Sequence, residues 1–269
     1  MSTKQKLALA KTLATEFGER PEVVAVGLGG SIASGRHDDT SDIDLYVFTK
    51  GSVSLEFRRD QMERHGAGQF DLNMQYWDEG DEWIQSTTDI EVDCIYWPTH
   101  WIEGQVHSIL IDHEPKNAYT TCFATTIRNI EILTDKSDWL SELKKFANQP
   151  FPETLRNNIL RRNLPLLSNV IPSYCNQISK AHARNDLFSV HHRLTEFLAT
   201  YFDLLFAINR VFHPGEKRLI ACALDLCEPI PVNFQVRIER LFPLAASNNG
   251  LLLDEISSLV KDLKNLAEN

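Results

Sequence analysis

The spacing of hydrophobic residues divides the chain into a front part with strands and a rear part with helices. In the front part, apolar residues recur at helical spacing along residues 4–18, and short apolar or alternating runs follow. These runs predict strands at 23–28, 43–49, 70–76, 90–96 and 130–133. Further helices are expected at 55–65, 101–111 and 138–147. The acidic stretch at 78–81, with the adjoining Glu82, is expected to be a loop.

The pattern changes at the proline-flanked segment 148–152, after which no strand is expected. Apolar residues then recur three and four positions apart, which is typical of helices packed on one another. The predicted helices cover 153–171, 174–188, 190–212, 216–227 and 248–267. Pro165 should kink or end the first of them, because proline cannot donate a helical hydrogen bond. We therefore expect two domains, at residues 1–149 and 150–269.

Charge is distributed unevenly over a chain of 269 residues with a formal net charge of −10. Residues 1–149 hold 14 basic and 25 acidic side chains, whereas residues 150–269 hold 13 and 12. With 43% hydrophobic residues, the chain can bury a core, which excludes a disordered protein. Duplex nucleic acid is not an expected partner, because binding it requires clustered cations.

The five cysteines lack the spacing of a zinc site, and their odd number argues against a disulfide framework. The first residues lack the apolar core of a signal peptide, and no run of 18 apolar residues occurs. We expect no membrane contact and a cytoplasmic location.

The most informative stretch runs from Gly29-Gly30-Ser31 to Asp42-Ile43-Asp44. Glycines at the end of a strand let a ligand approach the backbone, and Ser31 adds a hydroxyl where a helix N-terminus would favour phosphate. Asp42 and Asp44 lie two residues apart on a strand and so point to the same face. Two adjacent carboxylates favour a cation between them, and Mg²⁺ prefers oxygen ligands.

A third carboxylate is expected from the strand at 90–96. Asp93 is the preferred candidate because it is followed by the apolar residues of a buried strand. Glu91 is the alternative, and it lies nearer the exposed start of the same strand. Either residue would join Asp42 and Asp44 if the two strands are neighbours.

Gly30 and Ser31 with Gly35, followed by Asp42-x-Asp44, resemble the signature of the nucleotidyltransferase superfamily that shares the palm fold of DNA polymerase beta. The resemblance covers about residues 22–97. It implies an α+β fold, with a mixed-sheet nucleotidyltransferase domain and then an all-helical domain. The rear resembles that of aminoglycoside and lincosamide nucleotidyltransferases, by architecture only. The expected reaction transfers a nucleoside monophosphate, most simply AMP from ATP, to a hydroxyl of a small molecule.

The same resemblance implies a role for each candidate residue. Gly30 and Ser31 would bind the β- and γ-phosphates, and two Mg²⁺ ions would be held by Asp42, Asp44 and Asp93. Asp93 would complete the second metal site or act as general base, with Glu91 as the alternative base. Arg36 and Lys217 are the candidate cations for the triphosphate.

Two other functions remain open on the sequence alone. The same domain could adenylylate a protein, as antitoxin partners in toxin–antitoxin pairs do, although those chains tend to be short. It could also bind nucleotide without catalysis. The sequence specifies neither the acceptor nor the nucleobase nor the oligomeric state.

Overall fold

The computed structural model describes residues 2–33 and 41–268. The chain forms two compact units. The first comprises Met1–Val106 and Thr126–Gln149, and the second comprises His107–Thr125 and Pro150–Asn269. The chain thus passes between the units three times, after Val106, Thr125 and Gln149, and His107–Thr125 is grouped with the rear of the chain in the second, helical unit.

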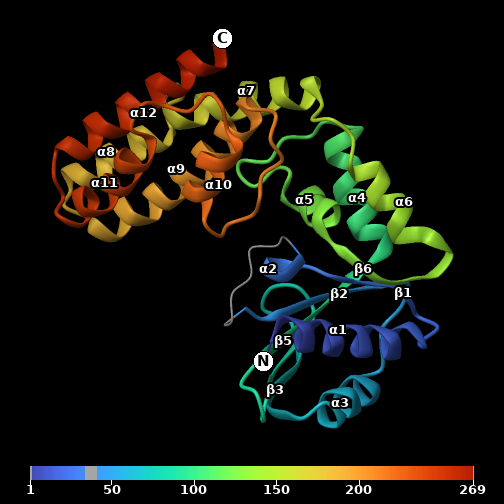
Figure 1. Ribbon diagram of the computed structural model, residues 1–269. Coiled ribbons are helices and arrows are strands. Elements are labelled where there is room, and N and C mark those ends of the chain that lie inside the picture. Colours follow the sequence, from blue (N-terminus) through green and yellow to red (C-terminus); the bar gives the residue numbers. More distant parts are fainter. Residues whose placement is uncertain (1, 34–40, 269) are drawn as a thin grey trace. The chain divides into compact units, whose positions relative to one another are not determined.

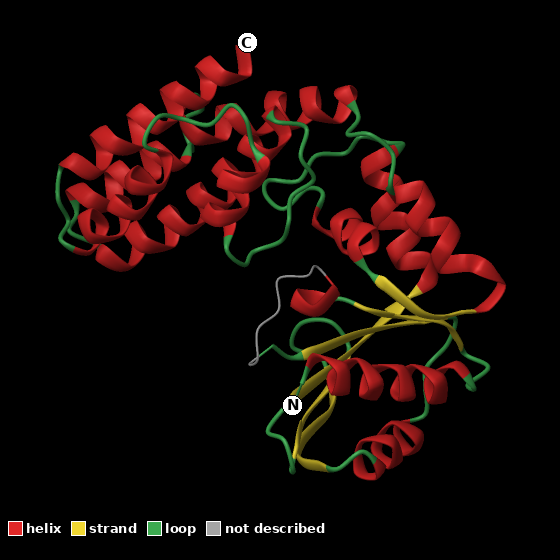
Figure 2. Cartoon of the chain, viewed as in Figure 1, coloured by secondary structure: helices red, strands yellow, loops and turns green. Residues whose placement is uncertain are grey.

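A mixed sheet of six strands forms the centre of the first unit, in the order β3-β4-β5-β2-β1-β6 (Figures 1 and 2). The strands are β1 (Val23–Leu28), β2 (Ile43–Thr49), β3 (Ala67–Met74), β4 (Gly80–Gln85), β5 (Glu91–Pro98) and β6 (Glu131–Asp135). Only β2 and β5 pair in parallel; the other neighbours are antiparallel. The α+β architecture expected from the sequence is confirmed.

One face of the sheet is apolar and covered by α1 (Thr3–Gly18) and α3 (Leu55–Arg64). Because side chains alternate along a strand, Ile43, Leu45 and Val47 of β2 point to this face, and none is accessible to solvent. Apolar residues of α1 and α3 complete the core on this side, among them Leu13, Phe17 and Met62. The intervening residues of β2 therefore point to the opposite face.

Aromatic side chains pack at one end of that opposite face. The rings of Tyr46 and Trp97 are 4.6 Å apart, and Trp101 of α4 (Thr99–Leu110) lies 5.3 Å from Trp97. Trp139 of α6 (Trp139–Ala147) packs 5.2 Å from Phe48. The other end of this face carries the acidic residues described below.

Residues 78–81 were expected to form an acidic loop, and this expectation was wrong for Gly80 and Asp81, which belong to β4. Asp81 lies in β4 and is 1% exposed, because Arg58 of α3 donates two hydrogen bonds of 2.7 and 2.6 Å to its carboxylate. The hydroxyl of Tyr96 donates a third at 2.7 Å. The Arg58 guanidinium also lies 4.0 Å from the centre of the Tyr96 ring. Asp81 thus anchors α3 to the sheet.

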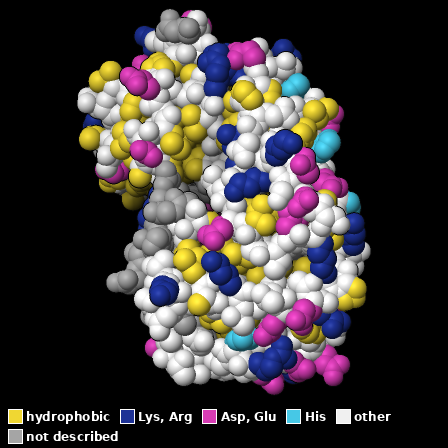
Figure 3. Space-filling view, turned by 45° about the vertical axis from the view of Figure 1, so that its right-hand side comes forward, with side chains coloured by type: hydrophobic (Ala, Val, Ile, Leu, Met, Phe, Trp, Pro, Cys, Tyr) yellow, Lys and Arg dark blue, Asp and Glu magenta, His cyan; other side chains and the backbone are white. Residues whose placement is uncertain are grey.

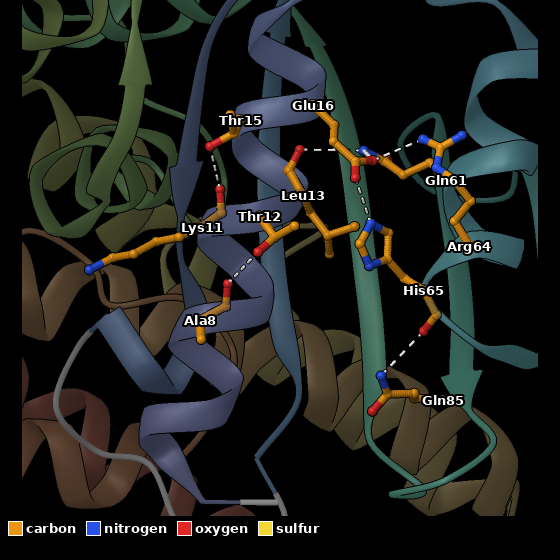
Figure 4. Close-up of polar contacts among 10 residues, drawn as sticks. All are labelled: Ala8, Lys11, Thr12, Leu13, Thr15, Glu16, Gln61, Arg64, His65 and Gln85. Atoms are coloured by element: carbon orange, nitrogen blue, oxygen red, sulfur yellow. Dashed lines mark hydrogen bonds and ion pairs between the residues drawn. The ribbon is translucent and has the colours of Figure 1, made fainter.

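A second polar cluster joins α1 to α3 (Figure 4). Glu16 of α1 accepts hydrogen bonds from Gln61 at 3.2 Å and Arg64 at 3.0 Å, and it contacts the His65 ring nitrogen at 2.8 Å. These contacts lower the pKa of Glu16 despite the opposing effect of its partial burial.

In the second unit, every regular element within residues 150–268 is a helix. These helices are α7 (Glu153–Ser168), α8 (Tyr174–Ala183), α9 (Leu187–Ile208), α10 (Leu219–Leu226), α11 (Phe234–Ala246) and α12 (Leu251–Glu268). Pro165 lies in the last turn of α7. The sequence reading missed α11, which contains Pro243 near its end and buries Phe234 and Ile238.

A buried carboxylate holds the segment 107–125 to the helices of this unit. Asp203 of α9 accepts hydrogen bonds from the backbone and hydroxyl of Thr120, both at 2.8 Å, and from the Asn163 amide at 3.0 Å. Burial raises the pKa of Asp203 to about 6, against these hydrogen bonds.

Acidic and basic side chains are interspersed over the face of the molecule drawn in Figure 3. Within the described ranges, no helix combines the length and apolar character needed to cross a membrane.

Replacing Arg58 by Met should lower the free energy of unfolding by about 3–5 kcal/mol, because it leaves the buried Asp81 carboxylate without its cation. Arg64→Met is the matched control and should cost less than about 1 kcal/mol, since Arg64 is half exposed. Urea unfolding followed by circular dichroism measures both. Equal stabilities of the two variants would contradict the anchoring role of Arg58.

Candidate active site

The parallel pairing of β2 with β5 brings two predicted carboxylates side by side. Asp44 and Asp93 are direct partners in the register of the two strands. Neighbouring strands lie about 4.8 Å apart, and paired residues point to the same side of a sheet. Both side chains are partly buried on the face opposite α1 and α3. Asp42 precedes Asp44 by two residues, just before β2 begins.

Four strands that are neighbours in the sheet each carry an acidic residue at the same cross-strand position. Glu82 of β4 is the register partner of Asp93, and Asp71 of β3 is the register partner of Glu82. Together with Asp44 these residues form a carboxylate row across β3, β4, β5 and β2. The sequence reading placed Glu82 in a loop and did not assign Asp71, because strand pairing between distant segments carries no local signal.

It is unfavourable for all the side chains of the carboxylate row to be ionised at once, because like charges repel. Burial, together with repulsion from Asp44, Glu82, Glu91 and Asp42, raises the pKa of Asp93 to about 7. For Asp93, burial is the largest cause and the neighbouring negative charges add to it. Such a group takes up a proton near neutral pH unless a cation compensates the charge.

Glu91 lies beside Glu82 on the diagonal of the antiparallel pair. A hydrogen bond with the Glu91 carboxyl raises the pKa of Glu82, with burial and the charges of Glu91, Asp71 and Asp42 as further causes. Glu91 is exposed, whereas Asp93 is partly buried. The two candidates for the third carboxylate therefore differ: Asp93 pairs with Asp44, and Glu91 interacts with Glu82.

The turn after β1 approaches Asp44 so closely that it requires glycine. Gly30 has a φ of +61°, and a Cβ atom there would lie 1.7 Å from Oδ2 of Asp44. The backbone N–H of Gly29 donates a 2.9 Å hydrogen bond to the Asp44 carbonyl. Asp44 is thus held against the glycine pair that the sequence identified as the place where a ligand meets bare backbone.

Lys6 of α1 supports the start of β2, which the sequence reading did not anticipate. Its ammonium group donates a 2.6 Å hydrogen bond to the carbonyl of Ser41, the residue before Asp42, and its side chain is 2% exposed. Lys6 lies on the same buried stripe of α1 as Ala10, Leu13 and Phe17. A lysine within a core-facing stripe is the signal that could have identified it.

The remaining predicted site residues are distributed over three parts of the chain. Ser31 follows Gly30 in the short helix α2 (Gly30–Ala33). Lys217 is exposed in a turn before α10, in the helical unit. Arg36 lies outside the described residues, as does Gly35. The structure therefore brings together Gly30, Asp44 and Asp93, and leaves the two predicted phosphate-binding cations as predictions.

The donor set suits a hard divalent cation, although it does not complete a site alone. In the part of the chain that the structure describes, no three His, Cys, Asp or Glu side chains are grouped so as to hold a metal ion. Mg²⁺ in proteins is commonly bound by one or two carboxylates together with substrate phosphate oxygens and water. The oxygen ligands of Asp44 and Asp93, with the raised pKa of Asp93, fit that mode of binding.

Comparisons with known proteins agree with this geometry. Residues 10–101 match the family model described as nucleotidyltransferase domain. This part of the chain is a nucleotidyltransferase domain. The match includes all of β1–β5 and every member of the carboxylate row. The chemistry of such a domain is the transfer of a nucleoside monophosphate.

A second family model matches the part of the chain that follows. Residues 118–219 match a domain of unknown function (DUF4037). Among solved structures, the chain is similar to a nucleotidyltransferase-like protein from Exiguobacterium sibiricum 255-15, with 14% identity and a TM-score of 0.45. That alignment covers 97% of this chain and 74% of the other. A search of curated proteins found no match.

Gly30→Ala should lower the free energy of unfolding by about 1–2 kcal/mol, because alanine is strained at positive φ and its Cβ meets the Asp44 carboxylate. Gly104→Ala is the control: Gly104 lies inside α4 with open space around it, and alanine should stabilise there by about 0.5–1 kcal/mol. Urea unfolding checks both, and a Gly30→Ala variant as stable as the wild type would contradict the close approach.

Asp93→Asn should stabilise the metal-free domain in a pH-dependent way. With a folded pKa of about 7, against about 3.9 unfolded, the wild type loses stability as the pH rises from about 4 to about 7. Asparagine removes that loss, so the melting temperature of the variant in EDTA should exceed that of the wild type by about 2–6 °C at pH 8.

The difference should vanish near pH 4, where both side chains are neutral. Asp60→Asn, on the exposed surface of α3, is the control and should give no such trend. A pH-independent difference for Asp93→Asn would show that burial and repulsion do not raise its pKa.

Proposed function

We propose that the chain is a magnesium-dependent nucleotidyltransferase that transfers a nucleoside monophosphate, AMP from ATP in the simplest case, to a hydroxyl of a small molecule. The single observation that supports this best is the register pairing of Asp44 with Asp93, beside Gly30, within a nucleotidyltransferase domain. Paired carboxylates beside a side-chain-free turn suit a cation that carries a polyphosphate.

The main role of the carboxylates would be to bind the metal ions at fixed positions. Asp42, Asp44 and Asp93 would hold two Mg²⁺ ions, whose role when bound is to stabilise the attacking and leaving oxygens of an in-line displacement. Gly30 and Ser31 would lie along the β- and γ-phosphates, where the missing side chain of Gly30 leaves room beside Asp44. Arg36 and Lys217 are proposed to neutralise further phosphate charge.

The reaction also requires a group that accepts a proton. The acceptor hydroxyl replaces pyrophosphate at the α-phosphorus, and its proton must pass to a base. A carboxyl with a pKa of about 7 can accept a proton near neutral pH, so Asp93 is the proposed base if it does not itself complete the second metal site. Glu91 remains the alternative base, because its carboxyl lies beside Glu82 in the same acidic surface.

The carboxylate row suggests the charge of the acceptor. Asp71 and Glu82 continue the row away from Asp44, beyond the three residues assigned to metal. An acceptor with amino groups would offset their charge, so an antibiotic of the aminoglycoside type is the first class to screen. A lincosamide type is the second.

Asp44→Asn should reduce pyrophosphate release by a hundredfold or more, because it removes a metal ligand that stabilises transition-state charge. The experiment incubates the chain with Mg²⁺, each of four nucleoside triphosphates and a panel of antibiotics, and measures pyrophosphate. Asp60→Asn is the matched control: it removes the same charge from the exposed surface of α3, and its rate should stay within tenfold of the wild type.

Other outcomes would redirect the proposal. Radiolabel from ATP that appears on protein would favour protein adenylylation, and metal-dependent triphosphate binding without turnover would favour a non-catalytic nucleotide-binding role. Full activity of Asp44→Asn would contradict the proposed site itself.

A further inference from the structure

The helical unit contains a cavity of its own. Helices α9, α10 and α11 enclose a volume of about 570 Å³, within the range of about 300–1,000 Å³ typical of small-molecule sites. All of its lining residues belong to this unit. Figure 1 shows the three helices near one another in the rear half of the chain. No role assigned above uses these residues.

The cavity has an apolar floor and an accessible rim. Phe202 of α9 and Ile238 of α11 line it and are 3% and 1% exposed, so they form the inner wall. Leu224 of α10 and Phe242 of α11 also line it, at 45% and 50% exposed. A ligand that entered would cover apolar surface that water now contacts, which favours binding of a carbon skeleton.

Small side chains help to keep the cavity open. Ala199 of α9 and Ala221 of α10 both line it, where larger residues would occupy the space. Ala199 is buried, whereas Ala221 is exposed near the rim. Ala221 is therefore a position at which added volume can close the cavity without disturbing the core.

The polar lining indicates the charge of the occupant. Only Arg218 and Glu239 carry full charges among the residues that line the cavity, so the lining has no net charge. The Gln235 amide donates a 2.9 Å hydrogen bond to Glu239, which places an amide and a carboxylate together at the wall. A triphosphate would lack the cations that it needs here, and a polyamine would lack the anions.

We infer that the helical unit binds a neutral, amphipathic small molecule in this cavity. Its carbon skeleton packs on Phe202 and Ile238, and a hydroxyl, amide or ether group meets Gln235 and Glu239. The inference does not depend on nucleotidyl transfer, because no member of the carboxylate row takes part.

The test uses N-phenyl-1-naphthylamine, a neutral dye whose fluorescence rises in apolar surroundings, titrated into the full chain. We expect saturable binding of one dye molecule per chain. Ala221→Trp should weaken the binding at least tenfold by filling the cavity, whereas Ala246→Trp should leave it unchanged. Ala246 is the matched control because it is an exposed alanine of α11 that does not line the cavity.

A second variant keeps the test valid if Ala221→Trp does not fold. Leu224→Asp adds a charge at the exposed rim and should also weaken binding tenfold, while thermal unfolding reports whether each variant is folded. Asp44→Asn should bind the dye as the wild type does, which separates this test from that of the transfer reaction. Unsaturable binding would overturn the inference, and so would wild-type affinity for the dye in folded Ala221→Trp and Leu224→Asp. Absence of dye binding by a chain that sedimentation shows to be a dimer would overturn it as well.

Discussion

Repulsion between carboxylates on neighbouring strands is the constraint on which the candidate site depends. Asp44 and Asp93 cannot move apart, because the backbone hydrogen bonds of β2 and β5 fix their register. That register is in turn set by the apolar face, where a slip by one residue would turn Ile43 and Leu45 away from the core. Hydrophobic burial on one side of the sheet thus keeps negative charges together on the other.

Contacts from three neighbouring elements keep Asp44 and Asp93 in these positions. Lys6 fixes the chain just before Asp42, Gly30 allows the turn after β1 to lie against Asp44, and Arg58 with Asp81 secures α3 beneath β4. None of them neutralises Asp93, whose pKa stays near 7. The first unit therefore positions negative charge for a cation, and in the proposed function the metal ion that accompanies the triphosphate would supply the positive charge.

Local sequence patterns predicted the parts of the site that depend on local structure. The alternation in Ile43-Asp44-Leu45 predicted both the strand and the outward carboxylate. Glu82 was missed because the acidic composition of 78–82 suggested a loop, whereas burial of Trp83 and pairing with β5 make it a strand. The Arg58–Asp81 pair joins two residues that are 23 positions apart in the sequence. Helix α11 was missed because it contains Pro243, a residue that usually marks the end of a helix. Such contacts are specified by tertiary packing, which a linear pattern does not record.

Binding of metal and triphosphate is expected to replace a proton on the carboxylates of β2 and β5. Isothermal titration calorimetry of MgATP near pH 7, in buffers of different ionisation enthalpy, measures that proton directly. The account predicts metal-dependent binding with release of a substantial fraction of one proton per chain, which falls toward zero at pH 9 because Asp93 is then already ionised. Binding that is independent of metal, or that releases the same number of protons at pH 7 and pH 9, would contradict it.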